Sequence, residues 1–519
     1  MNDQAPLLDA IAAYAGRGRL GYHMPGHQKG NGLAPAFSRL LAEYGAALDL
    51  TELPGLDNLA APDGCIGRSQ EAMARLAGSA YVYYLVNGAS AGLEAVALAM
   101  SGPDVPTILP ANCHTAIQQG LILSGSMPVI LPCLADLQWG LPLGTDREAA
   151  EVWLKRDNGD GDGRLPDEAL WISVNPTYNG LLADLGWEKR ILESRPGWGW
   201  AVDEAHGAHL PYGNVISSDE KPYSALHWDA DVVVQSAHKM GTGFTQTGIM
   251  HCNRPALAGK LRQAVNIMQS SSPSYLLMAS LDAWLAYLED GGVQKLRRTS
   301  ALARELAGRI RAIGDYRLWQ DELPDDCVVD PRKITLSSRE LGLDGFALAD
   351  ALRKEYEIDV ELATGEYALL IVNPTHSRED IDRTVDALMK IRDKRRNARP
   401  GLAGDGRERA AGAGQNGSVS DELRSIWADL YRPGQKPWRP AIPPREAFFA
   451  EQEKVEIERS RGRLAAASVV PYPPGIPLTC PGMEIRQETA GAIEAILKTG
   501  QRCAGLEYID GRWYISVVK

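Results

Sequence analysis

A lysine and an acid, each near the end of an apolar run, are the residues of this chain best suited to chemistry. Lys239 follows the run DVVVQS at residues 231–236, and Asp203 lies in the run GWAVDE at residues 199–204. Burial at a strand end favours the neutral, nucleophilic form of a lysine. A buried acid is costly unless it is paired with a cation or capped by backbone N–H groups. Together they indicate a pyridoxal phosphate site, in which Lys239 holds the cofactor and Asp203 faces its ring nitrogen.

Two further segments offer groups that such a cofactor needs. The segment NGASAG, residues 87–92, joins a predicted strand to a predicted helix. Its backbone N–H groups and the hydroxyl of Ser90 could bind a phosphate, and Ser236 could add a second hydroxyl. An ordinary strand–helix turn would explain the same glycine-rich pattern. His114, in the segment ANCHTAI, is a candidate for stacking on the cofactor ring.

Three histidines flank the proposed acid and lysine, namely His206, His209 and His238. The spacing of the first two would suit a metal, but no third ligand has a recognisable spacing, so no metal site is predicted. We expect His206 and His238 to lie near the oxygens of the cofactor or to donate a proton to the reacting carbon. A purely structural role fits His209 equally well.

These residues require a scaffold that brings several strand ends together. Short apolar runs alternate with helical patterns through the middle of the chain, and the predicted strands are residues 81–87, 106–110, 128–132, 169–175, 199–204 and 231–236. This alternation predicts an α/β fold with a mostly parallel, doubly wound sheet. Ligands bind beyond the carboxyl ends of the strands in such sheets. Asn87, Asp203 and Ser236 all stand at those ends.

The length of 519 residues predicts several domains. Residues 1–70 are expected to form an N-terminal arm that contacts a partner subunit, and residues 71–292 the large cofactor-binding domain. Residues 293–396 are expected to form a smaller α+β domain. Residues 397–420 form a Gly/Ala/Arg-rich linker, and residues 421–519 a C-terminal α+β domain.

Composition excludes several classes of protein. The net charge of −12 argues against nucleic acid or an anionic membrane as a partner. The seven cysteines are scattered without a Cys-x-x-Cys pair, which is typical of reduced thiols. No signal peptide is evident, and no run approaches the ~20 apolar residues of a membrane span. We therefore expect a cytoplasmic protein.

A series of ordered segments resembles the ornithine/lysine/arginine decarboxylases of pyridoxal-phosphate fold type I, in the shorter bacterial form without an N-terminal wing domain. The segments are MPGHQKG, TELPGLDNL, YLVNGASAG, ANCHTAIQQGLILSG, NPTYNGLLADL, VDEAHGAHLPY, QSAHKMGTGFTQTG, QSSSPSYLLMASLDA and YPPGIPLTCPG. The resemblance implies an aspartate-aminotransferase-like large domain. It also implies an obligate homodimer with shared active sites, in which residues 270–275 approach the neighbouring cofactor, and it leaves a larger oligomer of such dimers open. The last domain would shape the substrate entrance.

The resemblance also assigns residues to roles. It implies that Lys239 carries the cofactor, that Asp203 pairs with its nitrogen and that His114 stacks on its ring. The remaining cofactor contacts that it implies are Ser90, Ala91, Ser236 and His238. The cofactor would then be pyridoxal phosphate. The substrate would be a basic L-amino acid, which the enzyme decarboxylates to the corresponding amine. Lysine and arginine lead as substrates, with ornithine third.

Alternatives of two kinds remain open from the sequence. One is another pyridoxal-phosphate enzyme on the same fold, either an aminotransferase or a decarboxylating oxidase. An aminotransferase needs an arginine from the small domain for the substrate carboxylate; Arg332, Arg339 and Arg353 are present, but none is distinctive. The other is a non-catalytic regulatory relative, which the presence of Asp203 and Lys239 opposes.

Two departures from the family pattern have consequences for the site. Gly241 and Gly243 stand in a usually more apolar run, and are expected to add backbone freedom after the lysine. Met483 occupies the place of a glutamate in the family loop, with Glu484 one position later. If that acid recognises the basic end of the substrate, either Glu484 reaches it or another acid serves. The other candidates are Glu52 and Asp57.

Overall fold

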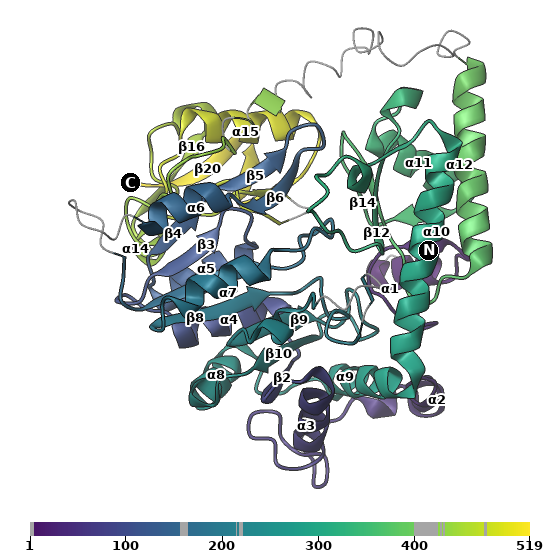
Figure 1. Ribbon diagram of the computed structural model, residues 1–519, viewed down its shortest axis with the longest axis horizontal. Coiled ribbons are helices and arrows are strands. Elements are labelled where there is room, and N and C mark those ends of the chain that lie inside the picture. Colours follow the sequence, from purple (N-terminus) through teal and green to yellow (C-terminus); the bar gives the residue numbers. More distant parts are fainter. Residues whose placement is uncertain are drawn as a thin grey trace.

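The computed structural model describes residues 5–155, 165–213, 215–216, 222–398, 424–425, 428, 431–471 and 475–519. Within these residues the chain forms a central sheet with helices on both faces, a smaller sheet carrying two long helices, and a C-terminal part with its own sheet (Figure 1). Residues 399–420 of the predicted linker lie outside the described residues.

The central sheet has seven strands in the order β2-β10-β9-β8-β7-β3-β4. They are β2 (Tyr81–Leu85), β3 (Thr107–Pro110), β4 (Pro128–Leu131), β7 (Ala169–Val174), β8 (Trp198–Asp203), β9 (Val232–Ser236) and β10 (Gly248–Cys252). Only β10 is antiparallel to its neighbours. The predicted mostly parallel sheet is therefore confirmed, and β10 is the strand that the sequence analysis did not include.

Helices bury both faces of this sheet. They are α3 (Cys65–Ala77), α4 (Gly88–Met100), α5 (Thr115–Ser124), α6 (Arg147–Leu154), α7 (Leu185–Glu193), α8 (Pro255–Met268) and α9 (Tyr275–Tyr287). Successive residues of β9 alternate between two apolar clusters: Val233 packs with α3, α7 and α9, whereas Val232 and Val234 pack with α4, α5 and α8. Burial on both sides explains why the strands are apolar throughout.

Close packing of α4 on the sheet depends on Gly92. A Cβ atom at Gly92 would lie 2.5 Å from Cδ1 of Leu85 and 2.9 Å from Cγ1 of Val234. We expect Gly92→Ala to lower the stability by ~1–3 kcal/mol through overpacking. The matched control is Gly259→Ala in α8, which meets no atom within 4 Å and should gain ~0.5–1 kcal/mol as a helical alanine. Thermal unfolding midpoints measure both changes, and equal shifts would contradict this account.

A smaller α+β part follows the central sheet. Its elements are α10 (Val293–Ile313), β11 (Arg317–Leu318), β12 (Lys333–Ser337), α11 (Gly345–Tyr356), β13 (Ile358–Val360), β14 (Leu362–Ala363), β15 (Ala368–Ile371) and α12 (Arg378–Ala398). The sheet order is β11-β12-β15-β14, and α10 and α12 lie side by side along it (Figure 1). β12 is fully buried and begins at a lysine.

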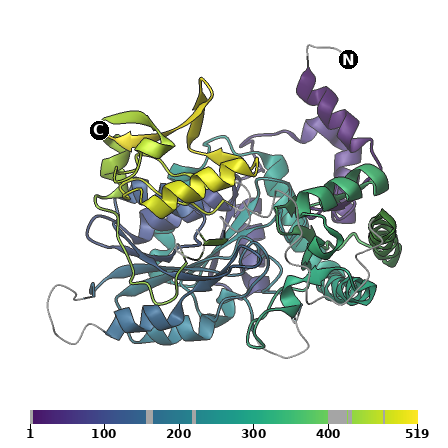
Figure 2. The ribbon, with the colours of Figure 1, turned by 90° about the horizontal axis from the view of Figure 1, so that it is seen from above.

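The N-terminal residues contact this smaller part of the same chain. The first elements are α1 (Pro6–Ala15), β1 (Leu20–Tyr22) and α2 (Pro35–Tyr44), and β1 pairs in parallel with β13. Tyr22 is fully buried there. In contrast, α1 has no buried residue and projects from the body on the side away from the C-terminal part (Figure 2).

The C-terminal part contains α14 (Pro444–Phe449), β16 (Gln452–Glu456), β17 (Val470–Pro471), α15 (Gln487–Lys498), β18 (Cys503–Ala504), β19 (Leu506–Ile509) and β20 (Arg512–Val518). A hairpin of β5 (Cys133–Asp136) and β6 (Leu141–Thr145) precedes α6 in the central part. Across the described residues, no helix combines the length and the apolar character needed to cross a membrane.

Candidate active site

A cavity of about 490 Å³ opens at the carboxyl ends of β7, β8 and β9. Residues from all three parts of the chain line it. The central part contributes most of the polar groups, the smaller part contributes residues 364–367, and the C-terminal part contributes Ile476, Ile496 and Thr499. The cavity lies where the carboxyl ends of neighbouring parallel strands meet, as expected for a doubly wound sheet.

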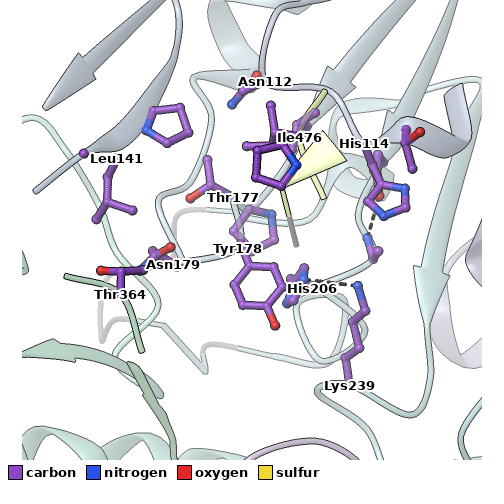
Figure 3. Close-up of a pocket in the computed structure, with 18 of the residues that line it drawn as sticks. Asn112, His114, Leu141, Thr177, Tyr178, Asn179, His206, Lys239, Thr364 and Ile476 are labelled. Carbon is purple, nitrogen blue, oxygen red and sulfur yellow. Dashed lines mark hydrogen bonds between the residues drawn. The ribbon is translucent and has the colours of Figure 1, made fainter. Parts of the chain in front are cut away.

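Lys239 lies in this cavity three residues beyond the end of β9. Its Nζ atom is 3.1 Å from Nε2 of His206, and Figure 3 shows the two side chains pointing toward each other. Burial lowers the pKa of Lys239, against the opposing attraction of Asp203 and Glu361. A lowered pKa increases the fraction of neutral amine, which is the form that attacks a carbonyl carbon.

Asp203 ends β8 beside this lysine. Its side chain is 6% exposed and lines the cavity. One carboxylate oxygen accepts the backbone N–H of Ala205 at 3.1 Å, so the capping role considered from the sequence is partly present. The rest of the carboxylate is available to a cation in the cavity.

The first turn of α4 provides a cradle for an anion. Gly88, Ala89 and Ser90 line the cavity, and Asn87 makes no side-chain cap to the helix. Free N–H groups at a helix N-terminus favour a phosphate. Ser236 also lines the cavity, whereas Ala91 is buried and does not. The donors present therefore fit the phosphate of pyridoxal phosphate.

Three of the four histidines considered from the sequence line the cavity. Nδ1 of His114 accepts the backbone N–H of Ala116 at 3.2 Å as the N-cap of α5, which fixes the ring. His238 contacts the carbonyl oxygen of Thr247 at 3.1 Å through Nδ1, and burial lowers its pKa to about 4. Together with His206, these rings surround the space next to Lys239.

His209 serves the structure instead. Its Nε2 lies 2.9 Å from Oδ2 of Asp330, and both side chains are fully buried. Burial would raise the pKa of Asp330, but the attraction of His209 and Arg332 holds it at about 2. This contact anchors the turn that leads into β12, as the structural alternative anticipated.

The sequence analysis missed Tyr178 of the central part and two groups of the smaller part, Glu361 and Lys333. Tyr178 stacks obliquely on His206 with ring centroids 4.6 Å apart, and its hydroxyl donates to Glu361 at 2.5 Å. Lys333, at the start of β12, lies 2.7 Å from Nδ1 of His206. A lysine at the head of a short strand pattern, in DPRKITLS, was the available signal.

The two glycines after Lys239 do not add backbone freedom, which corrects that expectation. Neither has a positive φ. A Cβ atom at Gly241 would lie 2.5 Å from the carbonyl oxygen of Ala237, and one at Gly243 would lie 2.5 Å from Oγ1 of Thr247. Tight packing of this loop is therefore the reason for both glycines.

The acids considered for the basic end of the substrate do not line the cavity. Glu484 and Glu52 are outside it, and Asp57 accepts backbone N–H groups ahead of α3. Apart from Asp203, the acid among the described lining residues is Glu366, whose oxygens bind Arg339 at 2.7 Å and Arg424 at 3.4 Å.

No arginine is among the described residues that line the cavity. Arg332 donates to the carbonyl oxygens of Val372 and Met240. Arg339 and Arg353 pair with acids, at 2.7 and 3.5 Å. The arginine clamp of an aminotransferase therefore has no counterpart in the described part of the cavity. The described residues also contain no cluster of three or more metal-ligating side chains.

Known proteins share both the sequence and the architecture of this chain. The family described as Orn/Lys/Arg decarboxylase matches through its major domain over residues 5–322 and through its C-terminal domain over residues 431–508. The arginine decarboxylase of Bacillus subtilis is 31% identical over 97% of this chain and 96% of that protein. The lysine decarboxylase LdcA of Pseudomonas aeruginosa is 24% identical over 94% of this chain and 75% of that protein.

A solved structure extends the comparison to the fold. Lysine decarboxylase A from Pseudomonas aeruginosa has a TM-score of 0.74 and 22% sequence identity, covering 99% of this chain and 80% of that one. A serine palmitoyltransferase solved with its pyridoxal-phosphate internal aldimine shares the fold over 73% of this chain and 87% of that one, with a TM-score of 0.53 and 17% sequence identity. The chain therefore belongs to the Orn/Lys/Arg decarboxylase family, as a pyridoxal-phosphate enzyme that decarboxylates a basic amino acid.

Proposed function

We propose that this enzyme decarboxylates L-arginine, with Lys239 as the residue that binds pyridoxal phosphate covalently. The cavity amine of Lys239, next to His206 and Asp203, is the observation that carries the proposal. Arginine is favoured over lysine because the arginine decarboxylase of Bacillus subtilis resembles the chain more closely than the lysine decarboxylase of Pseudomonas aeruginosa does.

Each lining residue then has a chemical task. When bound, pyridoxal phosphate accepts the electron pair left on the α-carbon as CO2 departs. The carboxylate of Asp203 would hold a proton on the ring nitrogen of the cofactor by its charge, and the N-terminus of α4 with Ser90 and Ser236 would hold the phosphate. His114 would contact the cofactor ring. Either His238 or the released amine of Lys239 donates the proton that replaces the carboxyl group.

The apolar walls of the cavity favour loss of the negative charge of the substrate α-carboxylate. Leu141, Val174 and Ile476 line it beside the polar groups. The reacting carboxylate loses its negative charge when the bond to the α-carbon breaks, so an apolar wall next to it opposes the charged reactant more than the transition state. We propose that these side chains face the α-carboxylate.

Three parallel assays test the substrate. The purified full-length protein, supplied with pyridoxal phosphate, is incubated separately with L-arginine, L-lysine and L-ornithine, and both CO2 and the released amine are quantified. We expect kcat/KM for arginine to exceed the other two values by at least ~10-fold, because the polar end groups of the three substrates differ. A preference for lysine or ornithine would refute arginine, and a keto acid without CO2 would refute decarboxylation.

We also propose that the enzyme is a cytoplasmic homodimer. The apolar side chains of α1 are left open to solvent, with Leu7 70%, Leu8 68% and Ile11 56% exposed. A second copy of the chain would cover such a face. All seven cysteines are unpaired, which suits a reducing compartment. Light scattering should give twice the chain mass of 56.3 kDa, and a single-chain mass at micromolar concentration would contradict the dimer.

A further inference from the structure

A second lysine, Lys333, lies behind His206 and outside the lining of the cavity. Its side chain is fully buried, and Nζ is 2.7 Å from Nδ1 of His206 and 2.5 Å from the carbonyl oxygen of Tyr178. The other ring nitrogen of His206 faces Nζ of Lys239 at 3.1 Å. One imidazole therefore bridges two amines, of which only Lys239 reaches the cavity.

Hydrogen-bond chemistry limits how protons are shared in this chain of three groups. A neutral imidazole has one N–H donor and one acceptor nitrogen. If Lys333 is an ammonium group, it donates to Nδ1, and Nε2 then carries the hydrogen and donates to the lone pair of Lys239. Two ammonium groups cannot both satisfy a neutral imidazole, because both would be donors facing a single acceptor nitrogen.

The distances favour the proton on Lys333. Hydrogen bonds from charged donors are shorter than neutral ones, typically about 2.7–2.9 Å for N–H donors. Both contacts of Lys333 are at or below this range, whereas the contact of Lys239 with His206 is longer. The carbonyl oxygen of Tyr178 can only accept, which adds a second acceptor to Lys333.

Charged groups around the three residues are nearly balanced. Asp203 and Glu361 face Lys239, while Asp330, Glu361 and Arg332 face Lys333; His114 and His238 face His206. Burial, and to a lesser extent repulsion by the two lysines, holds the pKa of His206 well below its usual range, so its ring is neutral. Burial also lowers the pKa of Lys333 to about 7. The charge count alone allows a second ammonium group. The neutral His206 offers a single acceptor nitrogen, however, and burial lowers the pKa of both lysines, so one protonated lysine is favoured over two.

We propose that Lys333 is a positioning residue that holds the proton of this cluster and, through the Nε2–H form of His206, keeps the amine of Lys239 neutral for attack on the cofactor aldehyde. The inference rests on the proposed function, because it takes Lys239 as the point of attachment. Lys333 does not touch the cavity, so it acts only through the histidine.

Removing Lys333 should make cofactor attachment depend on pH. In Lys333→Met, His206 is free to carry its hydrogen on Nδ1, and Nε2 then accepts from a protonated Lys239. The substitution also removes a like charge from behind His206, which favours the protonated form of Lys239. Each unit by which the pKa of Lys239 rises lowers the neutral fraction of the amine tenfold at a pH well below it.

The experiment follows attachment rather than turnover. Full-length protein freed of cofactor is mixed with pyridoxal phosphate between pH 6.5 and about 9.5, and the rate of covalent attachment is followed by absorbance. We expect Lys333→Met to attach at least ~10-fold more slowly than the wild type near pH 7 and to approach it near pH 9. Lys333→Gln, which keeps an N–H donor for Nδ1 but no charge, should show a smaller deficit of the same form.

If the attachment rate of Lys333→Met recovers at high pH in the same sample, the variant is folded. If Lys333→Met does not fold, the pH profile of Lys333→Gln tests the role of Lys333 instead. The matched control is Lys354→Met, because Lys354 is a surface lysine with a 70% exposed side chain, and it should follow the wild-type profile. A deficit of equal size at every pH, or none, would overturn the role of Lys333. Attachment of the cofactor to another residue in the wild type would instead refute the proposed function.

Discussion

Replacing Lys239 by alanine will remove both the visible absorption of the bound cofactor and the release of CO2. Among the described residues that line the cavity, Lys239 is the one lysine. We therefore expect no other lining residue to replace it in covalent attachment. We expect kcat to fall by at least ~10⁴-fold, since enzymes accelerate reactions by ~10⁶-fold or more and this route depends on the attached cofactor. Steady-state CO2 release and absorbance spectra of the same samples measure the two losses together.

A chemical test locates the attachment independently of activity. Borohydride reduction of the cofactor-saturated wild type, followed by peptide mapping, should place the cofactor mass on the peptide that contains Lys239. Lys354→Ala provides the control, because this exposed side chain pairs only with Asp350 one helical turn away. Full turnover in Lys239→Ala, or the cofactor mass on a different peptide, would end the assignment.

Loss of the Asp203 carboxylate is expected to give the second largest effect. A fixed charge aimed at a site where charge changes during the reaction is typically worth ~10²–10³ in kcat. We therefore expect Asp203→Ala to lower kcat by this factor, with a smaller change in KM, because in the proposed function the carboxylate acts on the cofactor rather than on the substrate. Measurements of kcat and KM with arginine, at saturating cofactor, test this split.

Asp203→Asn separates the charge from the shape of the side chain. The amide oxygen can still accept the N–H of Ala205, which keeps the turn after β8. The asparagine variant should therefore unfold at the wild-type temperature and still lose most of the activity. Wild-type kcat in this variant would show that the charge of Asp203 has no part in the reaction.

The strands of the central sheet could be predicted because each is apolar on both faces. All six predicted strands are present within one or two residues of their expected ends. β10 escaped notice since its five residues follow the loop of Lys239 directly and include a histidine, His251. That histidine is buried, and its ring nitrogens contact Gln235 and Ser79. The local pattern of hydrophobic residues does not reveal these partners.

Residues near the strand ends were predictable for a similar reason. Lys239, Asp203 and Ser236 follow apolar runs, and parallel strands deliver their carboxyl ends to one edge of a sheet. The structure places all three in one cavity. In contrast, Ala91 is buried and does not line the cavity, although Gly88, Ala89 and Ser90 just before it do.

The sequence alone indicated the family through the resemblance of its ordered segments. Residue types and local periodicity indicated the α/β class and the candidate residues Asp203 and Lys239. Only the tertiary structure brought Lys333 to His206 across 127 positions of sequence and enclosed the cavity with residues of the smaller and C-terminal parts. Contacts of this kind arise from packing between parts of the fold that are far apart in the sequence, and the spacing of residues along the chain does not reveal them.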